Sequence, residues 1–172
     1  MRARTIRRGH NRTTDDLRAL MQSLFVAELL QPSDELWLIS PWISDIAVID
    51  NADLGFSGLQ PDWGARDILL SEILGALTVR GCAVYVELRP DDHNTRFVKR
   101  LRAAAPSGAS LNLRTSEVLH EKGLLADSFI LSGSMNVTYS GVQLLDELVR
   151  LDTSASAIAE ARLAFRARWG IA

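Results

Sequence analysis

Apolar positions along the chain follow two spacings, one typical of helices and one typical of strands. Apolar residues three and four apart predict helices at 13–29, 66–80, 92–105 and 153–169. Short apolar runs between them predict buried strands at 36–40, 82–88, 111–114 and 148–151. Because strands alternate with helices, we expect an α/β sandwich in which a mixed β-sheet is covered by helices on both faces.

Residues 45–64 follow neither spacing, and their richness in Asp, Gly and Pro predicts a long loop. Loops of this length are usually functional or mobile, although a dimer contact or a tolerated insertion would also fit. The chain has 172 residues, of which 47% are hydrophobic and 23% charged. That is enough to bury one full core, so we expect a single domain over residues 13–172.

The net charge of −2 predicts no overall attraction to nucleic acid, so any such affinity must come from local clusters. Residues 1–12 form a basic N-terminal arm, which either lies on phosphate groups or is a solvated terminus. A second cluster falls on the predicted helix 92–105, where we expect a solvent-exposed helix face. The basic residues of the arm are Arg2, Arg4, Arg7, Arg8 and Arg12, and those of the helix are Arg96, Lys99, Arg100 and Arg102.

The sequence has no apolar run of transmembrane length, and residues 1–8 lead into no signal-peptide core, so a cytoplasmic protein is expected. The single cysteine, Cys82, cannot form an intrachain disulfide and lies in an apolar strand, which predicts a core position. No cluster of Asp, Glu, His or Cys at metal-ligand spacing accompanies the candidate site described next. We therefore expect no metal and no cofactor.

Residues 119–147 contain more chemically specialised side chains than any other stretch. The run 119–126 predicts a strand, a turn follows, and residues 129–131 predict a second strand that returns antiparallel to the first. Residues two apart on a strand share a face, so His120 and Lys122 should point the same way.

The exit of this predicted hairpin has a similar arrangement. Ser134 and Asn136 are also two residues apart, and Gly133 before them permits a close approach of the backbone. Glu147, further on, could accept the second ring N–H of a histidine and so fix its tautomer.

These side chains suit an anionic tetrahedral centre. An imidazole can attack or donate a proton, an ammonium attracts phosphate, and a hydroxyl and an amide bind phosphoryl oxygens. Each residue taken alone is more often structural or solvated. Their joint occurrence at fixed spacing favours a site that cleaves phosphodiesters.

The pattern H-x-K-x4-D, then G-S-x-N, then a glutamate eleven residues after the asparagine, resembles the signature of the phospholipase D superfamily. The resemblance implies a phospholipase D-like fold and a metal-independent phosphodiesterase, in which one histidine forms a phosphohistidine and a second protonates the leaving oxygen. Asp127 has the opposite strand parity, so we expect a structural role for it. The residues that match are His120, Lys122, Asp127, Gly133, Ser134, Asn136 and Glu147.

Members of this superfamily use two copies of the motif per active site, whereas this chain has one. The other histidines, His10 and His93, lack a lysine two residues on. The second half-site must then come from a second chain, which predicts a twofold homodimer. Small endonucleases and one class of restriction enzymes are similar in having a single motif.

Residues 40–46 (SPWISDI) and 133–142 also resemble DpdK, a narrower group of small phospholipase-D-like proteins. These belong to bacterial clusters that place 7-deazaguanine derivatives in DNA and restrict unmodified DNA. The resemblance implies DNA as substrate and other proteins of the cluster as partners. We therefore favour a dimeric nuclease acting in defence against phage or foreign DNA.

Two alternatives remain open. One is a phosphodiesterase acting on phospholipid, which is disfavoured because the sequence shows no amphipathic membrane helix with a basic face and no anchor signal. The other is a non-catalytic DNA-binding or scaffold subunit of a DNA modification or restriction system. The intact set of polar residues stands against it, because loss of chemistry usually leaves a substituted residue.

Overall fold

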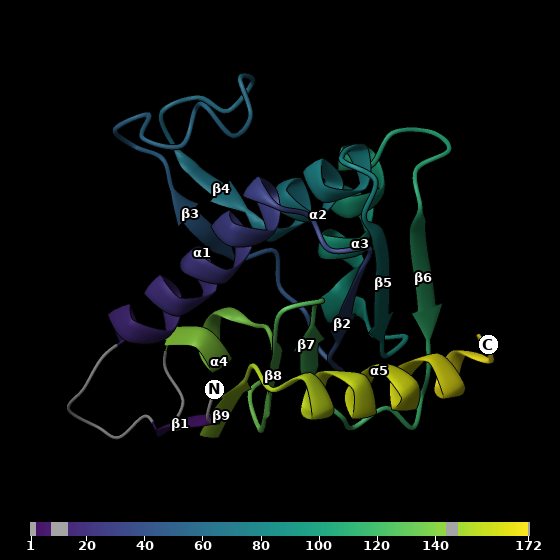
Figure 1. Cartoon of the computed structure of the whole chain (residues 1–172). Helices are drawn as coiled ribbons and strands as arrows, with labels where there is room; N and C mark the ends of the chain where they lie inside the picture. The colour runs from purple at the N-terminus through teal and green to yellow at the C-terminus, as the bar shows by residue number, and fades with distance from the viewer. Residues whose placement is uncertain (1–2, 8–13, 144–147, 172) are drawn as a thin grey trace.

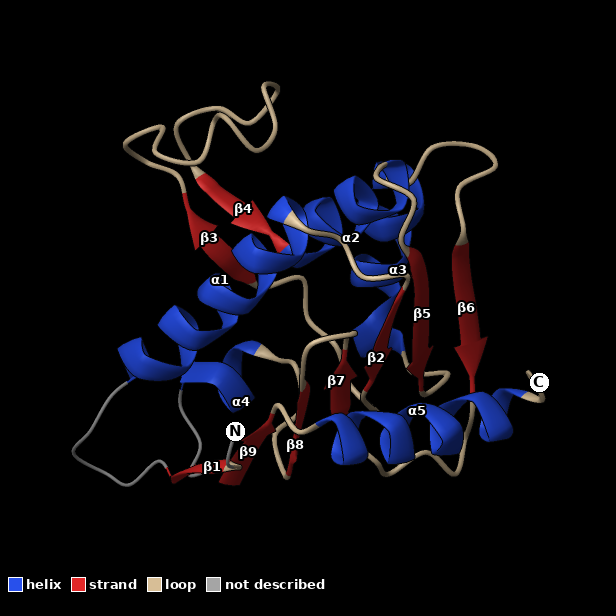
Figure 2. Cartoon of the chain, in the orientation of Figure 1, coloured by secondary structure: helices blue, strands red, loops and turns tan. Residues whose placement is uncertain are grey.

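The computed structural model describes residues 3–7, 14–143 and 148–171, which form a seven-stranded sheet between helices (Figures 1 and 2). The sheet has the order β1-β9-β8-β7-β2-β5-β6, with β2, β5 and β6 parallel and the remaining pairs antiparallel. A separate pair, β3 and β4, lies beside it. The elements are β1 (Arg4–Arg7), α1 (Thr14–Leu30), β2 (Glu35–Ile39), β3 (Ala47–Asp50), β4 (Asp67–Leu69), α2 (Leu70–Val79), β5 (Ala83–Leu88), α3 (Asp92–Ala104), β6 (Leu111–Thr115), β7 (Gly123–Leu125), β8 (Ile130–Gly133), α4 (Tyr139–Gln143), β9 (Leu148–Asp152) and α5 (Ala155–Trp169).

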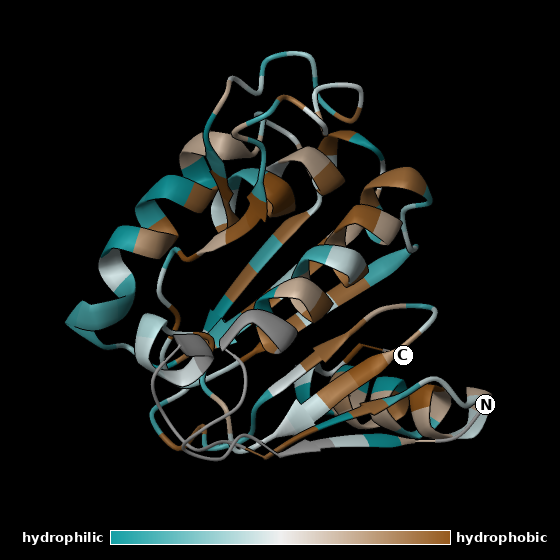
Figure 3. Ribbon diagram, turned by 90° about the vertical axis from the view of Figure 1, so that its left-hand side faces the viewer, coloured by the Kyte–Doolittle hydropathy of each residue, from teal (hydrophilic) through white to brown (hydrophobic). Residues whose placement is uncertain are grey.

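Strand β2 is buried on both faces, which explains its nearly continuous apolar sequence. Leu36 and Leu38 belong to the core shared with α1, α2 and α3, whereas Trp37 packs against Phe165 of α5 on the other face. Trp37 also stacks on Tyr85 of β5, with ring centroids 3.9 Å apart. Apolar residues, brown in Figure 3, gather along the strands and on the helix sides that face them. The expected mixed sheet with helices on both faces is confirmed.

Three strands bring their loops to one edge of the sheet, which we call the carboxyl edge. Strands β2 and β5 are parallel and end there. Strand β7 is antiparallel to both β2 and β8, so β8 runs in the same direction as β2 and also ends there. Ile43, after β2, forms a bridge with Val137, after β8, and the Ser44 N–H donates to the Val137 carbonyl at 2.8 Å. The Arg89 N–H, after β5, donates to the Pro41 carbonyl at 3.1 Å. The loops therefore form one connected surface.

The segment expected to be one long loop contains strand β3, which pairs antiparallel with β4. The loop proper is 51–66, and the buried Asn51 orders it by bonding the Gly64 carbonyl and the Phe56 N–H. Helix α2 accordingly begins at Leu70 and not at residue 66. The Glu72 carboxylate caps it by accepting the Leu69 N–H at 3.0 Å.

The basic N-terminal segment also differs from the expected arm. Residues Arg4–Arg7 form β1, an edge strand that pairs antiparallel with β9 in the main sheet. Within the described part of the chain, no helix combines the length and the apolar character needed to cross a membrane.

A buried carboxylate lies where α1 leads into β2. Glu28 is 2% exposed, and one of its oxygens accepts the Ser33 N–H at 3.1 Å. Burial raises the pKa of Glu28 above its usual 4.5, although the hydrogen bonds from Ser33 oppose the shift. Burial, followed by the nearby charge of Glu28, raises the pKa of Cys82 to about 12, so this thiol is an unreactive core residue.

Glu28→Gln should stabilise the fold at neutral pH. Because the folded pKa of Glu28 lies above the unfolded value, its contribution to stability is complete below about pH 4.5 and is lost as pH rises through the folded pKa. Glutamine keeps an acceptor for the Ser33 N–H and carries no charge. The gain in Tm should therefore be larger at about pH 8 than at about pH 4.5. The matched exposed variant Glu160→Gln should show no such trend, and equal gains at both pH values would contradict the assignment.

Candidate active site

His120 and Lys122 lie in the loop that leads from β6 into β7, and not on a strand as the sequence predicted. Strand β7 is only Gly123–Leu125, because its first residue already pairs with Ile39, the last residue of β2. Upstream of that point, the Lys122 side chain curls back and its Nζ donates to the His120 carbonyl at 2.6 Å. The loop is thus shaped by a lysine-to-backbone bond and not by strand pairing.

Lys122 still lies at the carboxyl edge. Because Gly123 pairs with the end of β2 and with Ser132 of β8, Lys122 lies level with Ser40 and Gly133. It also borders a groove of about 330 Å³ between α5 and strands β8 and β9. Lys122 is therefore close to Gly133, the first residue of the glycine-serine segment.

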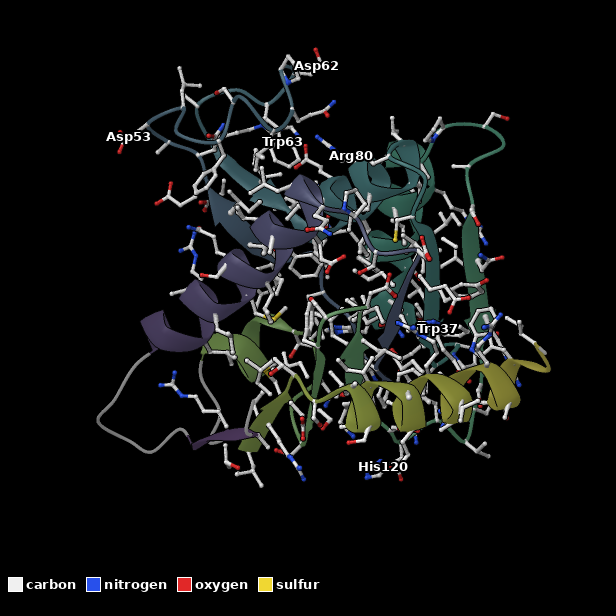
Figure 4. All side chains as sticks on the ribbon, in the orientation of Figure 1. Trp37, Asp53, Asp62, Trp63, Arg80 and His120 are labelled. Carbon is white, nitrogen blue, oxygen red and sulfur yellow. The ribbon has the colours of Figure 1, made fainter. Side chains whose placement is uncertain are left out.

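The His120 side chain is exposed, and Figure 4 shows it at the side of the molecule away from the loop that contains Asp53 and Asp62. The backbone just before it is fixed, because Arg89 Nε donates to the Leu119 carbonyl at 2.8 Å. An imidazole held on a fixed backbone and open to solvent is accessible to a large substrate.

Gly133 and Ser134, at the end of β8, contact the start of β9. Gly133 has φ +152°, and a Cβ there would lie 1.9 Å from the Leu148 carbonyl oxygen, so no other residue fits without moving the backbone. The Ser134 N–H donates to that carbonyl at 3.0 Å, and the Leu148 N–H donates to Ser134 Oγ at 3.1 Å. Gly133 therefore permits a close approach of the backbone to Leu148, and the Ser134 hydroxyl holds the start of β9.

Asn136 is positioned by the loop that follows β2. Its Oδ1 lies 3.4 Å from Oγ of the fully buried Ser40, which also accepts the Val137 N–H at 3.4 Å. Within the described residues, nothing bonds to Asn136 Nδ2, so the amide N–H groups are available as donors. Asn136 and Ser134 thus have different neighbours, although the sequence placed them on one face.

The loop 40–46 is the part of the site that the motif did not reveal. Asn94 of α3 fixes it, because its Oδ1 accepts the Ile43 N–H at 2.7 Å and its Nδ2 donates to the Pro41 carbonyl at 2.9 Å. Ser44 Oγ lies 3.0 Å from His93 Nε2. A useful sequence signal was its place directly after a buried strand, since sites in α/β folds form at the carboxyl ends of strands.

Asp45 ends this loop and anchors it to two helices. Its buried carboxylate accepts the N–H and the hydroxyl of Ser71 at the start of α2, both at 2.9 Å. Arg100 of α3 donates to the same carboxylate at 3.2 Å. The loop that positions Asn136 is therefore attached to the helical layer by charged hydrogen bonds.

Asp127 lies at the other end of β7, away from the candidate chemistry. Its Oδ2 accepts the Asp34 N–H at 2.8 Å, and its Oδ1 accepts a hydrogen bond from Arg162 of α5. The Asp127 N–H donates to Ser33 Oγ at 2.9 Å. The side chain thus ties the β7–β8 turn to β2 and α5.

Some expected site residues lie outside the described residues, namely Glu147 and Arg2, Arg8 and Arg12 of the basic segment. His10 lies outside them as well. Arg4 is exposed on β1, and the backbone of Arg7 pairs with Leu148 next to the motif. Within the described residues, no group of three His, Cys, Asp or Glu side chains could hold a metal ion.

No family model matches the chain, and no curated protein matches it in sequence. Solved structures do match. NucT from Helicobacter pylori superposes with a TM-score of 0.63 at 10% identity, over 96% of this chain and 94% of that one. Nuc from Salmonella typhimurium, a phospholipase D family member, gives 0.62 at 12% identity, over 98% and 94%.

The chain has the phospholipase D-like fold. A third match is TrmBL2, an archaeal chromatin protein with a novel mode of DNA binding, at a TM-score of 0.56 and 14% identity, over 99% of this chain and 53% of that one. The fold expected from the motif is therefore confirmed. At these identities the similarity extends to the fold alone, and the roles of individual residues depend on the geometry described above.

Asp127→Asn should lower stability more than chemistry. The variant removes the charge that Arg162 binds, and the side chain is partly exposed, so the cost should be about 1 kcal/mol. That corresponds to a fall in Tm of about 2–4 °C for a chain of this size. Asp53→Asn, in the exposed loop, is the control and should leave Tm unchanged. A lost activity with an unchanged Tm would show that Asp127 belongs to the chemistry.

Proposed function

We propose that the protein is a phosphodiesterase of the phospholipase D type, a nuclease that cleaves DNA. The observation that carries the proposal is the arrangement at the carboxyl edge. Lys122 and Asn136 lie next to the ends of the adjacent strands β7 and β8, near Gly133, and His120 is exposed two residues before Lys122. Phosphoryl oxygens are the ligands that such donors bind best.

The proposed reaction proceeds in two displacements. A ring nitrogen of His120 attacks phosphorus, the bond to the leaving oxygen breaks, and a second histidine gives that oxygen its proton. The second histidine then takes a proton from water, whose oxygen attacks phosphorus and releases the imidazole of His120. Lys122 and Asn136 would stabilise the charge that develops on the phosphoryl oxygens, and we propose Glu147 as the residue that orients the His120 ring.

The second histidine, in this proposal, is His120 of a second copy of the chain, since the sequence contains one motif. Three large apolar side chains that are close to the motif in sequence are exposed, and we propose that they contribute to the interface. Val118 is 88% exposed, Tyr139 48% and Leu148 44%.

DNA is the proposed substrate, and defence against phage or foreign DNA together with other proteins of a modification or restriction cluster is the proposed setting. The resemblance of residues 40–46 and 133–142 to the DpdK group supports this. Arg4 and Arg7 lie on β1, next to the strand that follows the motif, and we propose that the basic segment, with Arg8 and Arg12, contacts the DNA backbone.

A non-catalytic DNA-binding role is the second candidate, and the similarity to TrmBL2 favours it. It differs from the nuclease in what it predicts. The wild type would bind DNA without cleaving it, and His120→Ala would still bind DNA.

Wild-type protein should cleave DNA in the presence of excess EDTA, because the proposed charge stabilisation comes from protein donors. The assay should run with DNA, RNA and phospholipid in parallel.

His120→Ala should lose turnover, and Lys122→Ala and Asn136→Ala should lower kcat on the order of 100- to 1,000-fold. Asp53→Asn, purified in the same way, should retain full activity.

Three outcomes would count against the proposal. DNA binding without cleavage by the wild type would favour the binding subunit. Cleavage of phospholipid alone would favour the lipid phosphodiesterase. Loss of activity on chelation, restored by magnesium, would contradict the two-histidine chemistry.

Mixed dimers of wild type and His120→Ala should be inactive, because each shared site would need both histidines. Refolding equal amounts of the two proteins gives about a quarter of dimers with two intact histidines, so activity should fall to about a quarter under random pairing. Independent sites would retain about half. A value near half, after verified exchange of subunits, would show that one chain contains a complete site.

A further inference from the structure

A second groove opens beside the candidate site, between α3 and the carboxyl ends of β5 and β6. It has a volume of about 490 Å³, and Leu88 and Thr115 mark the two strand ends that border it. Clefts of this size accommodate small molecules or parts of a polymer. The residues that line the groove lie outside the motif.

The α3 side of the groove is basic. Thr95, Lys99 and Arg102 line it, and their spacing of four and three residues places them on one face of the helix. Arg100, by contrast, donates to the buried Asp45 at 3.2 Å. The sequence predicted that the basic cluster lies on a solvent-exposed face of this helix. In the structure one of its cations is used in the fold and two line the groove.

The basic side chains of the described residues differ in whether they pair with a carboxylate. Most arginines of the sheet and of α5 pair with carboxylates. Within the described residues, Arg89, Lys99 and Arg102 have no carboxylate within 4.0 Å. Three cations without a carboxylate partner among the described residues thus border this groove.

Arg89 connects the groove to the candidate nucleophile. Its Nε donates to the Leu119 carbonyl, one residue before His120, and its guanidinium carbon lies 5.2 Å from the centre of the Trp42 ring. Trp42 is itself fixed by a 3.2 Å bond from Nε1 to Asp91. Held in this way, the guanidinium keeps its two terminal nitrogens available to an anion, within the described part of the chain.

Two carboxylates also border the groove, Asp91 and Asp92. Asp91 is engaged, because its oxygens accept the His93 N–H at 2.9 Å and the Trp42 indole N–H. The three cations outnumber the two acids. Asp91 is the N-cap of α3 and Asp92 is its first residue, whereas Lys99 and Arg102 lie further along the helix.

We propose that this groove binds the sugar-phosphate backbone of a nucleic-acid strand next to the scissile phosphate, with Arg89, Lys99 and Arg102 as the phosphate contacts. The inference rests on the proposed nuclease function and adds to it the path of the substrate. The strand would run from His120 past Arg89 and along α3 to Arg102. The hydroxyls of Thr95 and Thr115 would supply neutral hydrogen bonds.

The test measures binding in the His120→Ala protein, which is not expected to cleave. Anisotropy of a fluorescently labelled 20-nucleotide single strand of DNA would be titrated over a range of salt concentrations. Lys99→Ala should raise Kd roughly fivefold near 0.1 M salt and reduce the slope of log K against log salt by about 0.7, the effect of one lost phosphate contact. Arg102→Ala should behave in the same way.

Arg96→Ala is the matched control. Arg96 lies on the same helix three residues from Lys99, is exposed and has no carboxylate partner among the described residues, but it does not line the groove. Its Kd should change less than about twofold. Thermal melting would verify that all variants are folded.

If Lys99→Ala and Arg96→Ala change Kd equally, and the wild type cleaves DNA, the groove is not the path of the strand. The nuclease proposal would be unaffected by that result. If the wild type cleaves no nucleic acid and the His120→Ala protein binds none, both proposals fail.

Discussion

Strand β2 is the element on which the rest of the molecule depends, because it pairs in opposite senses on its two sides. Its parallel partner β5 brings the start of α3 to the carboxyl edge. Its antiparallel partner β7 brings the loop that contains His120 and Lys122 to the same edge. Trp37 and Leu38 fill the cores on opposite faces, so a slip of the strand by one residue would place each side chain in the wrong core. The positions of the loops that form the candidate active site therefore depend on the pairing of β2.

Much of the fold could be predicted because strong periodic patterns coincide with the elements, as in 82–88 and 92–105. The prediction failed where an apolar run was short and surrounded by turn residues, as at Ala47–Asp50, or where pairing at the edge of the sheet decided the structure, as at Arg4–Arg7. In both cases distant partners determine the conformation, and local sequence does not contain them.

The candidate site shows the same division. Fixed spacing identified His120, Lys122 and Asn136 as a polar set, since chemistry requires particular residues. Spacing could not show that Ser40 lies beside Asn136, 96 positions away in sequence, nor that Asn94 holds a loop 51 positions away. Strand parity also misled, because Lys122 lies beyond the end of the hydrogen-bond ladder, where parity no longer decides direction.

The loop 51–66 has a practical consequence. It is ordered from within by Asn51, and Figure 4 shows Asp53 and Asp62 at the opposite side of the molecule from His120. At Gly55 and Gly58 an added Cβ would meet no atom within 4 Å. A fluorophore or an affinity tag inserted at this tip would report on the protein, or immobilise it, while the carboxyl edge stays open to long substrates.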